Sequence, residues 1–337
     1  MGVMTRLSRH SIPAPLRRAV FGLSYEEVGF GRRGFHDGDR QVRLRLEAVG
    51  GAFLRGYHVA LDEADPARVG QRLDAEPPAT GPAETGSGRG IPFAYEGAAM
   101  ALAVLDGLPV RGGSRLGRFL DGPARRCVYT AHVGAGWALA RLPRWRWRVV
   151  LRQLDPVLRW LAFDGHGFHD TYFRRRPARL DPGYPAHAYA QGVGRALWFV
   201  HCAEIDRIAA DIAGRPVAYR GDLWSGVALA ATFAGGASPD ALSALREAAG
   251  DCGPQVAQGA AFAAKARLAC GEHVGHTGTA VRILAGCSVE AAAETTDRTR
   301  IGLRADGDIP AYEVWRRLVA RELRTLAGGT VGGRHVG

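Results

Sequence analysis

Alanine-rich helical runs, each broken by a short glycine-containing stretch, recur along most of this chain and limit how it can fold. Three of the glycines, Gly194, Gly226 and Gly259, lie 32 and 33 residues apart. A period near 33 with two helices per unit is typical of stacked α-hairpins, as in tetratricopeptide-like arrays. Strand patterns are nearly absent. We therefore predict an all-α fold, either a stack of helical hairpins or an irregular helical bundle.

Apolar spacing and capping residues place the helices. Ser238 before Pro239-Asp240, and Ser288 with Glu290, are typical helix N-termini, because a hydroxyl caps the first turn and an acid faces the helix dipole. We expect helices at residues 40–60, 91–106, 125–142, 155–164, 187–201, 203–213, 222–234, 239–249, 255–270, 278–285, 288–295 and 310–325, with shorter ones at 15–21 and 62–73.

Composition divides the chain into segments. Residues 76–90 hold the prolines, glycines and small polar residues of a flexible surface loop. We expect a basic irregular N-terminal segment (1–38), a helical N-terminal part (39–75), this loop (76–90), a helical-hairpin domain (91–326) and a frayed tail (327–337).

The net charge of +11 is carried by arginine, since Lys265 is the single lysine. The arginines are spread along the sequence, apart from clusters at 144–148 and 174–176. They do not form the continuous basic patch typical of nucleic-acid binding, so we expect no nucleic-acid partner. An acidic or membrane-surface partner stays open. No apolar run is long enough for a transmembrane helix, and we expect a cytoplasmic protein. The five cysteines are odd in number and form no CxxC, so we expect scattered buried thiols rather than a disulfide framework or zinc ribbon.

The densest group of reactive side chains is Asp164-Gly-His-Gly-Phe-His-Asp-Thr-Tyr172, which ends an apolar helical run. Within nine residues it holds two carboxylates, two imidazoles and a phenol. These groups can move protons or bind a metal, so the stretch is the first candidate for a functional site.

Several motifs, taken in order, carry a resemblance to a known family. They are Phe93-Ala-Tyr-Glu-Gly-Ala-Ala-Met100, His132-Val-Gly-Ala-Gly-Trp-Ala138, Asp164-Gly-His-Gly-Phe-His169, Gly192-Val-Gly-Arg-Ala-Leu-Trp-Phe199, Asp222-Leu-Trp-Ser-Gly226 and Gln258-Gly-Ala-Ala-Phe262. Across residues 30–320 the chain resembles the UnbL-type proteins, a domain of unknown function encoded beside enediyne polyketide synthases.

The resemblance implies a bacterial protein of enediyne antibiotic biosynthesis, which acts on or assists maturation of the polyene made by an iterative polyketide synthase. Companion biosynthetic proteins, including a membrane protein, are the implied partners, and such a companion would bring the chain to the inner face of the membrane. The helical repeats leave a second function open: a non-catalytic scaffold that docks partner proteins or shields an apolar intermediate.

Polar residues inside alanine-rich helices are costly unless paired, so they are the candidate catalytic groups. They are Glu96, His132, Asp164, His169, Arg195 and Asp222. Each has a structural alternative. Asp222 suits a helix N-cap, Arg195 suits a buried salt bridge to Asp164 or Glu96, and the others suit a polar network between repeats. If Glu96, His132 and His169 converge at a cavity, the enzyme hypothesis gains; if they lie at separate interfaces, the scaffold hypothesis gains.

A metal is a further possibility, and its candidate ligands are His169, His276 and Glu96. No ExxH pair of a di-iron bundle, no GxSxG, no Walker loop and no dinucleotide fingerprint stands in a proper context, so the sequence names no nucleotide cofactor.

Aromatic side chains bracket the polar stretch and are the candidate ligand-binding residues: Trp145, Trp160, Phe163, Phe168 and Tyr172. Such residues can line a slot for a flat conjugated molecule, although ordinary core packing explains them as well. We predict a concave apolar pocket that touches Phe163, His169 and either Trp145 or Trp160.

Overall fold

The computed structural model describes residues 12–75, 90–108, 114–180 and 183–329. This part of the chain is helical and contains no β-strand, apart from one isolated bridge between Asp306 and Ile309. The predicted all-α fold is confirmed. The expected flexible loop lies outside the described residues except for Gly90, as do residues 330–337 of the expected tail.

The helices run in the order α1 (Ala14–Phe21), α2 (Phe30–Arg33), α3 (Arg40–Glu63), α4 (Pro66–Ala75), α5 (Ile91–Gly107), α6 (Arg115–Asp121), α7 (Val128–Leu139), α8 (Trp147–Leu151), α9 (Trp160–Tyr172), α10 (Tyr184–Val200), α11 (Ile205–Ala213), α12 (Val217–Ala234), α13 (Pro239–Ala249), α14 (Gly253–Ala269), α15 (Gly275–Ala285), α16 (Val289–Arg300) and α17 (Ala311–Gly329). Four 3₁₀ turns are described between them: η1 (Tyr25–Val28), η3 (Pro123–Arg125), η4 (Arg144–Arg146) and η5 (Gly250–Cys252).

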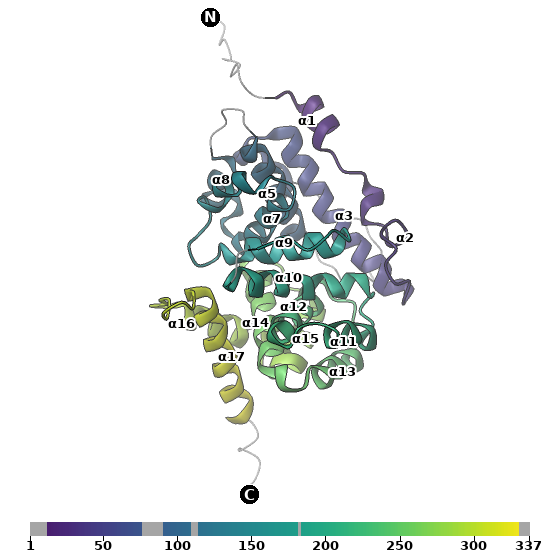
Figure 1. Ribbon diagram of the computed structural model, residues 1–337, viewed down its shortest axis with the longest axis vertical. Coiled ribbons are helices and arrows are strands. Elements are labelled where there is room, and N and C mark those ends of the chain that lie inside the picture. Colours follow the sequence, from purple (N-terminus) through teal and green to yellow (C-terminus); the bar gives the residue numbers. More distant parts are fainter. Residues whose placement is uncertain (1–11, 76–89, 109–113, 181–182, 330–337) are drawn as a thin grey trace, which may run out of the picture.

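The long helices form an inner layer, in which α3, α5, α7, α9, α10, α12, α14 and α16 each pack against the next. In Figure 1 α5, α7, α9, α10 and α12 follow one another downward in sequence order, with α3 along the right side of α5 and α7. Shorter helices, among them α4, α6, α11, α13 and α15, lie against this layer and against each other. The sequence explains the division: α5 is buried at every position, whereas α11 buries only Ile205, Ile208 and Ile212 on one face. This arrangement is a stack of helical hairpins.

Glycines set the spacing of the inner layer. A Cβ at Gly134 of α7 would overlap the carbonyl oxygen of Glu96 on α5, and one at Gly226 of α12 would overlap that of Gln191 on α10. Gly194 and Gly259, which mark the sequence repeat, make the same backbone contacts with α12. The repeat therefore records the points where neighbouring helices touch, because only glycine permits so close an approach.

The stack curves until its later helices reach its first ones. A disulfide joins Cys127, which precedes α7, to Cys270 at the end of α14. Next to it the Glu272 carboxylate accepts a hydrogen bond from the Ile91 backbone amide at 3.0 Å, at the start of α5. Glu272 also pairs with Arg267, whose guanidinium lies over the rings of Phe93 and Phe233. These contacts close the inner helices around a central space.

Three predictions need correction. The helix expected at 155–164 begins at Trp160 and continues through Tyr172, so the glycines of the polar stretch do not end it. They are helix contact points: Gly165 touches α7 and Gly167 touches α10. Not all the cysteines are free thiols, because Cys127 and Cys270 are bonded across 143 residues, a separation that no sequence spacing reveals. Helices α2, α6 and α8 were not expected.

No helix in the described part of the chain has the length and apolar character needed to cross a membrane.

Candidate functional site

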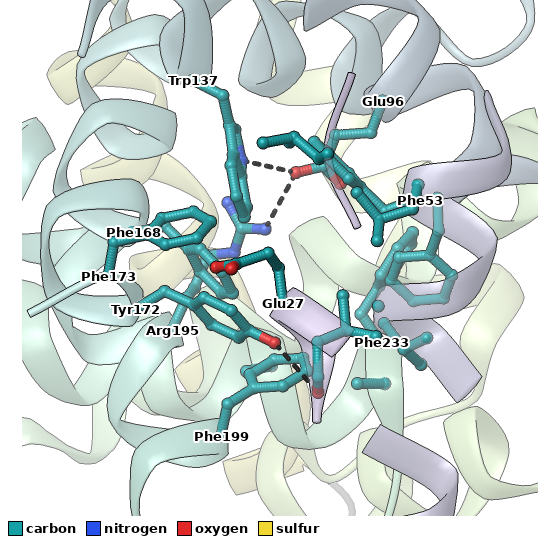
Figure 2. A pocket seen from close by; sticks show the side chains of 18 of the residues that line it. Glu27, Phe53, Glu96, Trp137, Phe168, Tyr172, Phe173, Arg195, Phe199 and Phe233 are labelled. Atoms are coloured by element: carbon teal, nitrogen blue, oxygen red, sulfur yellow. Dashed lines mark hydrogen bonds and ion pairs between the residues drawn. The ribbon is translucent and has the colours of Figure 1, made fainter. Parts of the chain in front are cut away.

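An apolar cavity lies in the central space enclosed by the inner helices (Figure 2). It has a volume of about 50 Å³, room for a few water molecules. Helices α3, α5, α7, α9, α10 and α12 all contribute to its wall, and the N-terminal segment adds Leu23, Glu27 and Val28. Its aromatic lining consists of Phe53, Phe93, Trp137, Phe168, Tyr172, Phe173, Phe199 and Phe233.

The Glu96 carboxylate is one of three charged groups that line this cavity, with Glu27 and Arg195. It accepts a hydrogen bond from Nε1 of Trp137 at 3.1 Å, and Nη2 of Arg195 lies 3.8 Å from it (Figure 2). Burial raises the pKa of Glu96 to about 7, although Arg195 opposes the shift. Near neutral pH Glu96 therefore populates both its protonated and its ionised form, whereas an exposed glutamate is ionised.

Arg195 joins Glu96 on α5 to Asp164 on α9. Its Nη1 donates to Oδ1 of Asp164, and its guanidinium lies 5.1 Å from the centre of the Phe168 ring. Burial lowers the pKa of Arg195, but Asp164 and Glu96 raise it by more, so the arginine stays charged. The predicted salt bridge to Asp164 or Glu96 is confirmed, and it is made to both. We call these three residues the Arg195 cluster.

A second, smaller apolar cavity of about 40 Å³ adjoins the same cluster. Its wall includes Tyr129, Asp164, Tyr312 and Trp315. Arg195, Leu229 and Phe233 line both cavities, so these three side chains form the partition between them. Two small apolar spaces thus meet at one buried arginine.

Asp222 belongs to a different group, which we call the Arg316 cluster: Tyr184, His187, Asp222, Gln258, Glu313 and Arg316. Oδ1 of Asp222 accepts a hydrogen bond from Nη1 of Arg316 at 2.6 Å, and its Oδ2 accepts one from Nδ1 of His187 at 2.8 Å. Burial raises the pKa of Asp222, but Arg316 and His187 lower it by more, so the group stays ionised. The suggested N-cap role is wrong, because α12 begins at Val217 and Asp222 lies within it.

His132 makes two backbone contacts and lies in neither apolar cavity. Its Nδ1 is 2.7 Å from the Val128 carbonyl oxygen, and its Nε2 accepts from the Asp155 amide at 3.1 Å. Burial lowers its pKa to about 4. A neutral imidazole with both nitrogens engaged fixes the turn before α9.

His169 forms part of a third polar group. The Asp170 carboxylate faces Nδ1 of His169 at 3.2 Å and Nε2 of His166 at 3.3 Å, and it accepts from the Tyr189 hydroxyl at 2.9 Å. Burial raises the pKa of Asp170, but the two histidines lower it by more, to below its usual range. Nε2 of His169 is buried without a hydrogen-bond partner. Its ring packs edge-on against Trp137 without lining the cavity.

The suggested metal ligands do not come together. His169 faces Asp170, His276 lies 3.3 Å from Nη1 of Arg45, and Glu96 belongs to the Arg195 cluster. Across the described ranges no three His, Cys, Asp or Glu side chains are grouped as a metal site.

The predicted aromatic residues divide between two faces of α9. Phe168 and Tyr172 line the first cavity. Phe163 packs instead with Trp147 and Trp160, and Trp145 is 70% exposed. The cavity therefore touches none of Phe163, His169, Trp145 or Trp160, because a helix turns positions 163 and 168 toward different sides.

Sequence reasoning missed Trp137, Phe233 and Arg316, which complete these sites. Trp137 stands in the motif His132–Ala138, and the cost of leaving its indole N–H unpaired in a buried helix was a usable signal. Phe233 lies in a helix that is buried on all sides and Arg316 in an amphipathic one, and neither pattern distinguishes them from other core or surface residues.

Comparison with known proteins gives a family. The model of a family described as a protein of unknown function (DUF1702) matches residues 14–323. The chain belongs to this family. No curated protein and no solved structure matches it. The match to the DUF1702 model runs from α1 into α17, so both cavities and all three polar groups lie within the family domain.

Proposed function

We propose that this protein binds and shields a slender, conjugated apolar molecule in the space between its inner helices. The observation that supports the proposal is the pair of apolar cavities that share Arg195, Leu229 and Phe233 in their walls. Aromatic walls suit a flat conjugated chain, and one polar point can fix its orientation. A polyene is larger than either cavity, so its binding requires the partition side chains to move.

The resemblance to enediyne biosynthesis proteins supplies the biological setting of the proposal: the bound molecule is the polyene, or a product of it, on its way to the enediyne core. Glu96, His132 and His169 lie in three separate places, which favours shielding over acid–base catalysis by these residues together. The second candidate function rests on Glu96 alone. Its pKa of about 7 would let it exchange a proton with a bound polyene.

Tryptophan fluorescence tests the binding. All-trans trienes, tetraenes and longer polyenes should quench Trp137, with affinity rising as the chain grows long enough to span both cavities. Trp137→Phe should remove most of the quenching, whereas Trp145→Phe, at an exposed site, should not. Absence of quenching up to the solubility limit of every polyene would refute the proposal.

The partition gives a sharper version of this test. Leu229→Ala joins the two cavities and should increase the affinity of the longer polyenes more than that of the triene. Leu229→Phe fills the same space and should reduce both. Val217→Ala is the control, since it removes a similar volume from a side chain on the same helix that is 74% exposed. Equal affinities in all three variants would place the ligand elsewhere.

A further inference from the structure

The second cavity holds two polar atoms without partners. Oδ2 of Asp164 and the hydroxyl of Tyr312 are buried and make no hydrogen bond, although both residues line this cavity and each is only 1% exposed. Leaving a buried polar group unpaired costs about 1–3 kcal/mol. Two such groups in one small, otherwise apolar space call for a molecule that satisfies both.

The chemistry of the two atoms specifies that molecule. Burial raises the pKa of Asp164, and the Arg195 guanidinium opposes this shift through its bond to Oδ1. As the anion of this ion pair, Asp164 offers its free Oδ2 as a hydrogen-bond acceptor. Tyr312 keeps its proton, because burial raises the pKa of its hydroxyl and the neighbouring Asp164 carboxylate raises it further. Its hydroxyl can therefore donate. A hydroxyl group is the smallest group that donates to one atom and accepts from the other.

We propose that the second cavity is a seat for a hydroxyl group, which donates to Oδ2 of Asp164 and accepts from the hydroxyl of Tyr312. This inference rests on the proposed function: the hydroxyl is the polar end of the conjugated chain, and the rest of the chain extends past Arg195 into the first cavity. The seat gives the ligand a direction, since the other cavity has no comparable pair of unpartnered atoms. A water molecule carries the same group and is the competing occupant.

Two probes of equal length test the seat: 2,4,6-octatrien-1-ol and 2,4,6-octatriene, titrated by tryptophan fluorescence. In the wild-type protein the alcohol should bind about tenfold more tightly, as expected for hydrogen bonds worth about 1.4 kcal/mol. Tyr312→Phe should reduce this preference to less than about threefold while the affinity of the hydrocarbon stays unchanged. Asp164→Asn, which keeps the shape of the side chain, is the second variant and should also reduce the preference.

Tyr129→Phe is the matched control. Tyr129 lines the same cavity, but its hydroxyl interacts with Arg300, so this variant should keep the full preference for the alcohol. Equal binding of the two probes to the wild-type protein would overturn the seat and leave the proposed function standing. Failure of both probes to bind, while longer polyenes still quench Trp137, would overturn the seat alone, and failure of every polyene would overturn the proposed function with it.

The melting temperature of the ligand-free protein shows whether water already occupies the seat. If the seat is empty until ligand arrives, Tyr312→Phe removes an unpaired buried hydroxyl and should leave the protein as stable as wild type or slightly more so. A loss of stability in this variant, combined with equal binding of the two probes, would mean that only water uses the seat, and the proposal would be wrong.

Discussion

The Arg195 cluster and the Arg316 cluster contain the same types of charged side chain, but these differ in their hydrogen bonds and in their pKa values. Each places a buried arginine between two carboxylates. Both oxygens of Asp222 accept hydrogen bonds, whereas Oδ2 of Asp164 accepts none. Asp222 has a lowered pKa, whereas Glu96 has one raised to about 7. In the Arg316 cluster the charged groups are all paired, although Nε2 of Gln258 has no partner, and this pairing suits a structural clasp between α10, α12 and α17. The unfilled positions of the Arg195 cluster suit a binding site.

The largest expected effect comes from breaking the complete cluster. Arg316→Leu removes the cation paired with the buried Asp222 and one of the two arginines paired with Glu313, and should reduce the free energy of unfolding by about 3–5 kcal/mol, measured by urea denaturation. Arg317→Leu is the control on the same helix. Its side chain is 62% exposed and pairs with the same Glu313, so its loss should cost less than about 1 kcal/mol. Equal effects would show that the Arg316 cluster is not a clasp.

One carboxylate from each cluster, Glu96 and Asp222, should respond to pH in opposite directions. The folded pKa of Glu96 is raised, so its contribution to stability is present below its ordinary pKa and is lost as pH rises from there through its folded pKa of about 7. Glu96→Gln should remove this loss, which is at most about 3 kcal/mol. The folded pKa of Asp222 is lowered, so its contribution is lost as pH falls below its ordinary range, and Asp222→Asn should remove that loss.

Melting curves of the wild type and both variants between pH 3 and pH 9 measure these contributions. His132 also loses its contribution at low pH, because its folded pKa is lowered to about 4, so each variant is compared with the wild type at the same pH. A Glu96→Gln difference that does not change between pH 5 and pH 8 would contradict the raised pKa.

Substitution in the polar group around Asp170 should cause an intermediate loss of stability. His169→Ala removes one of three donors to the Asp170 carboxylate and should cost about 1–3 kcal/mol. The chain should still fold, because His166 and Tyr189 remain. The melting temperature measures the cost. If His169→Ala abolishes polyene binding without changing stability, this histidine belongs to the site rather than to the network.

The smallest effect is expected at the edge of the Arg316 cluster. The side chain of His187 is 39% exposed, and its hydrogen bond to Asp222 raises its pKa. His187→Ala should cost less than about 1 kcal/mol. Any cost should decrease as pH rises through the folded pKa of the histidine, because the charged form makes the stronger bond. A cost as large as that of Arg316→Leu would make His187 a principal member of the clasp.

The sequence predicts the helices well because their apolar spacing and caps are local. It also predicts the partners of Arg195, since a buried arginine in an alanine-rich helix requires a carboxylate and two were available. It does not predict which aromatic residues line the cavity. That depends on how the stack curves, and the curvature turns Phe168 inward and Phe163 away. Helix glycines misled the prediction near residue 165, because a glycine that breaks a helix and one that touches a neighbouring helix have the same local pattern.

The disulfide of Cys270 and the hydrogen bond of Glu272 link the end of α14 to the starts of α7 and α5, and this link changes how the stack can unfold. In a linear repeat protein each unit interacts only with its neighbours, so the ends fray one unit at a time. Here the loop after α14 holds helices from the opposite end of the inner layer. Loss of the last hairpins would therefore expose the first ones, and the whole domain should unfold in one cooperative step instead of shortening from its C-terminal end.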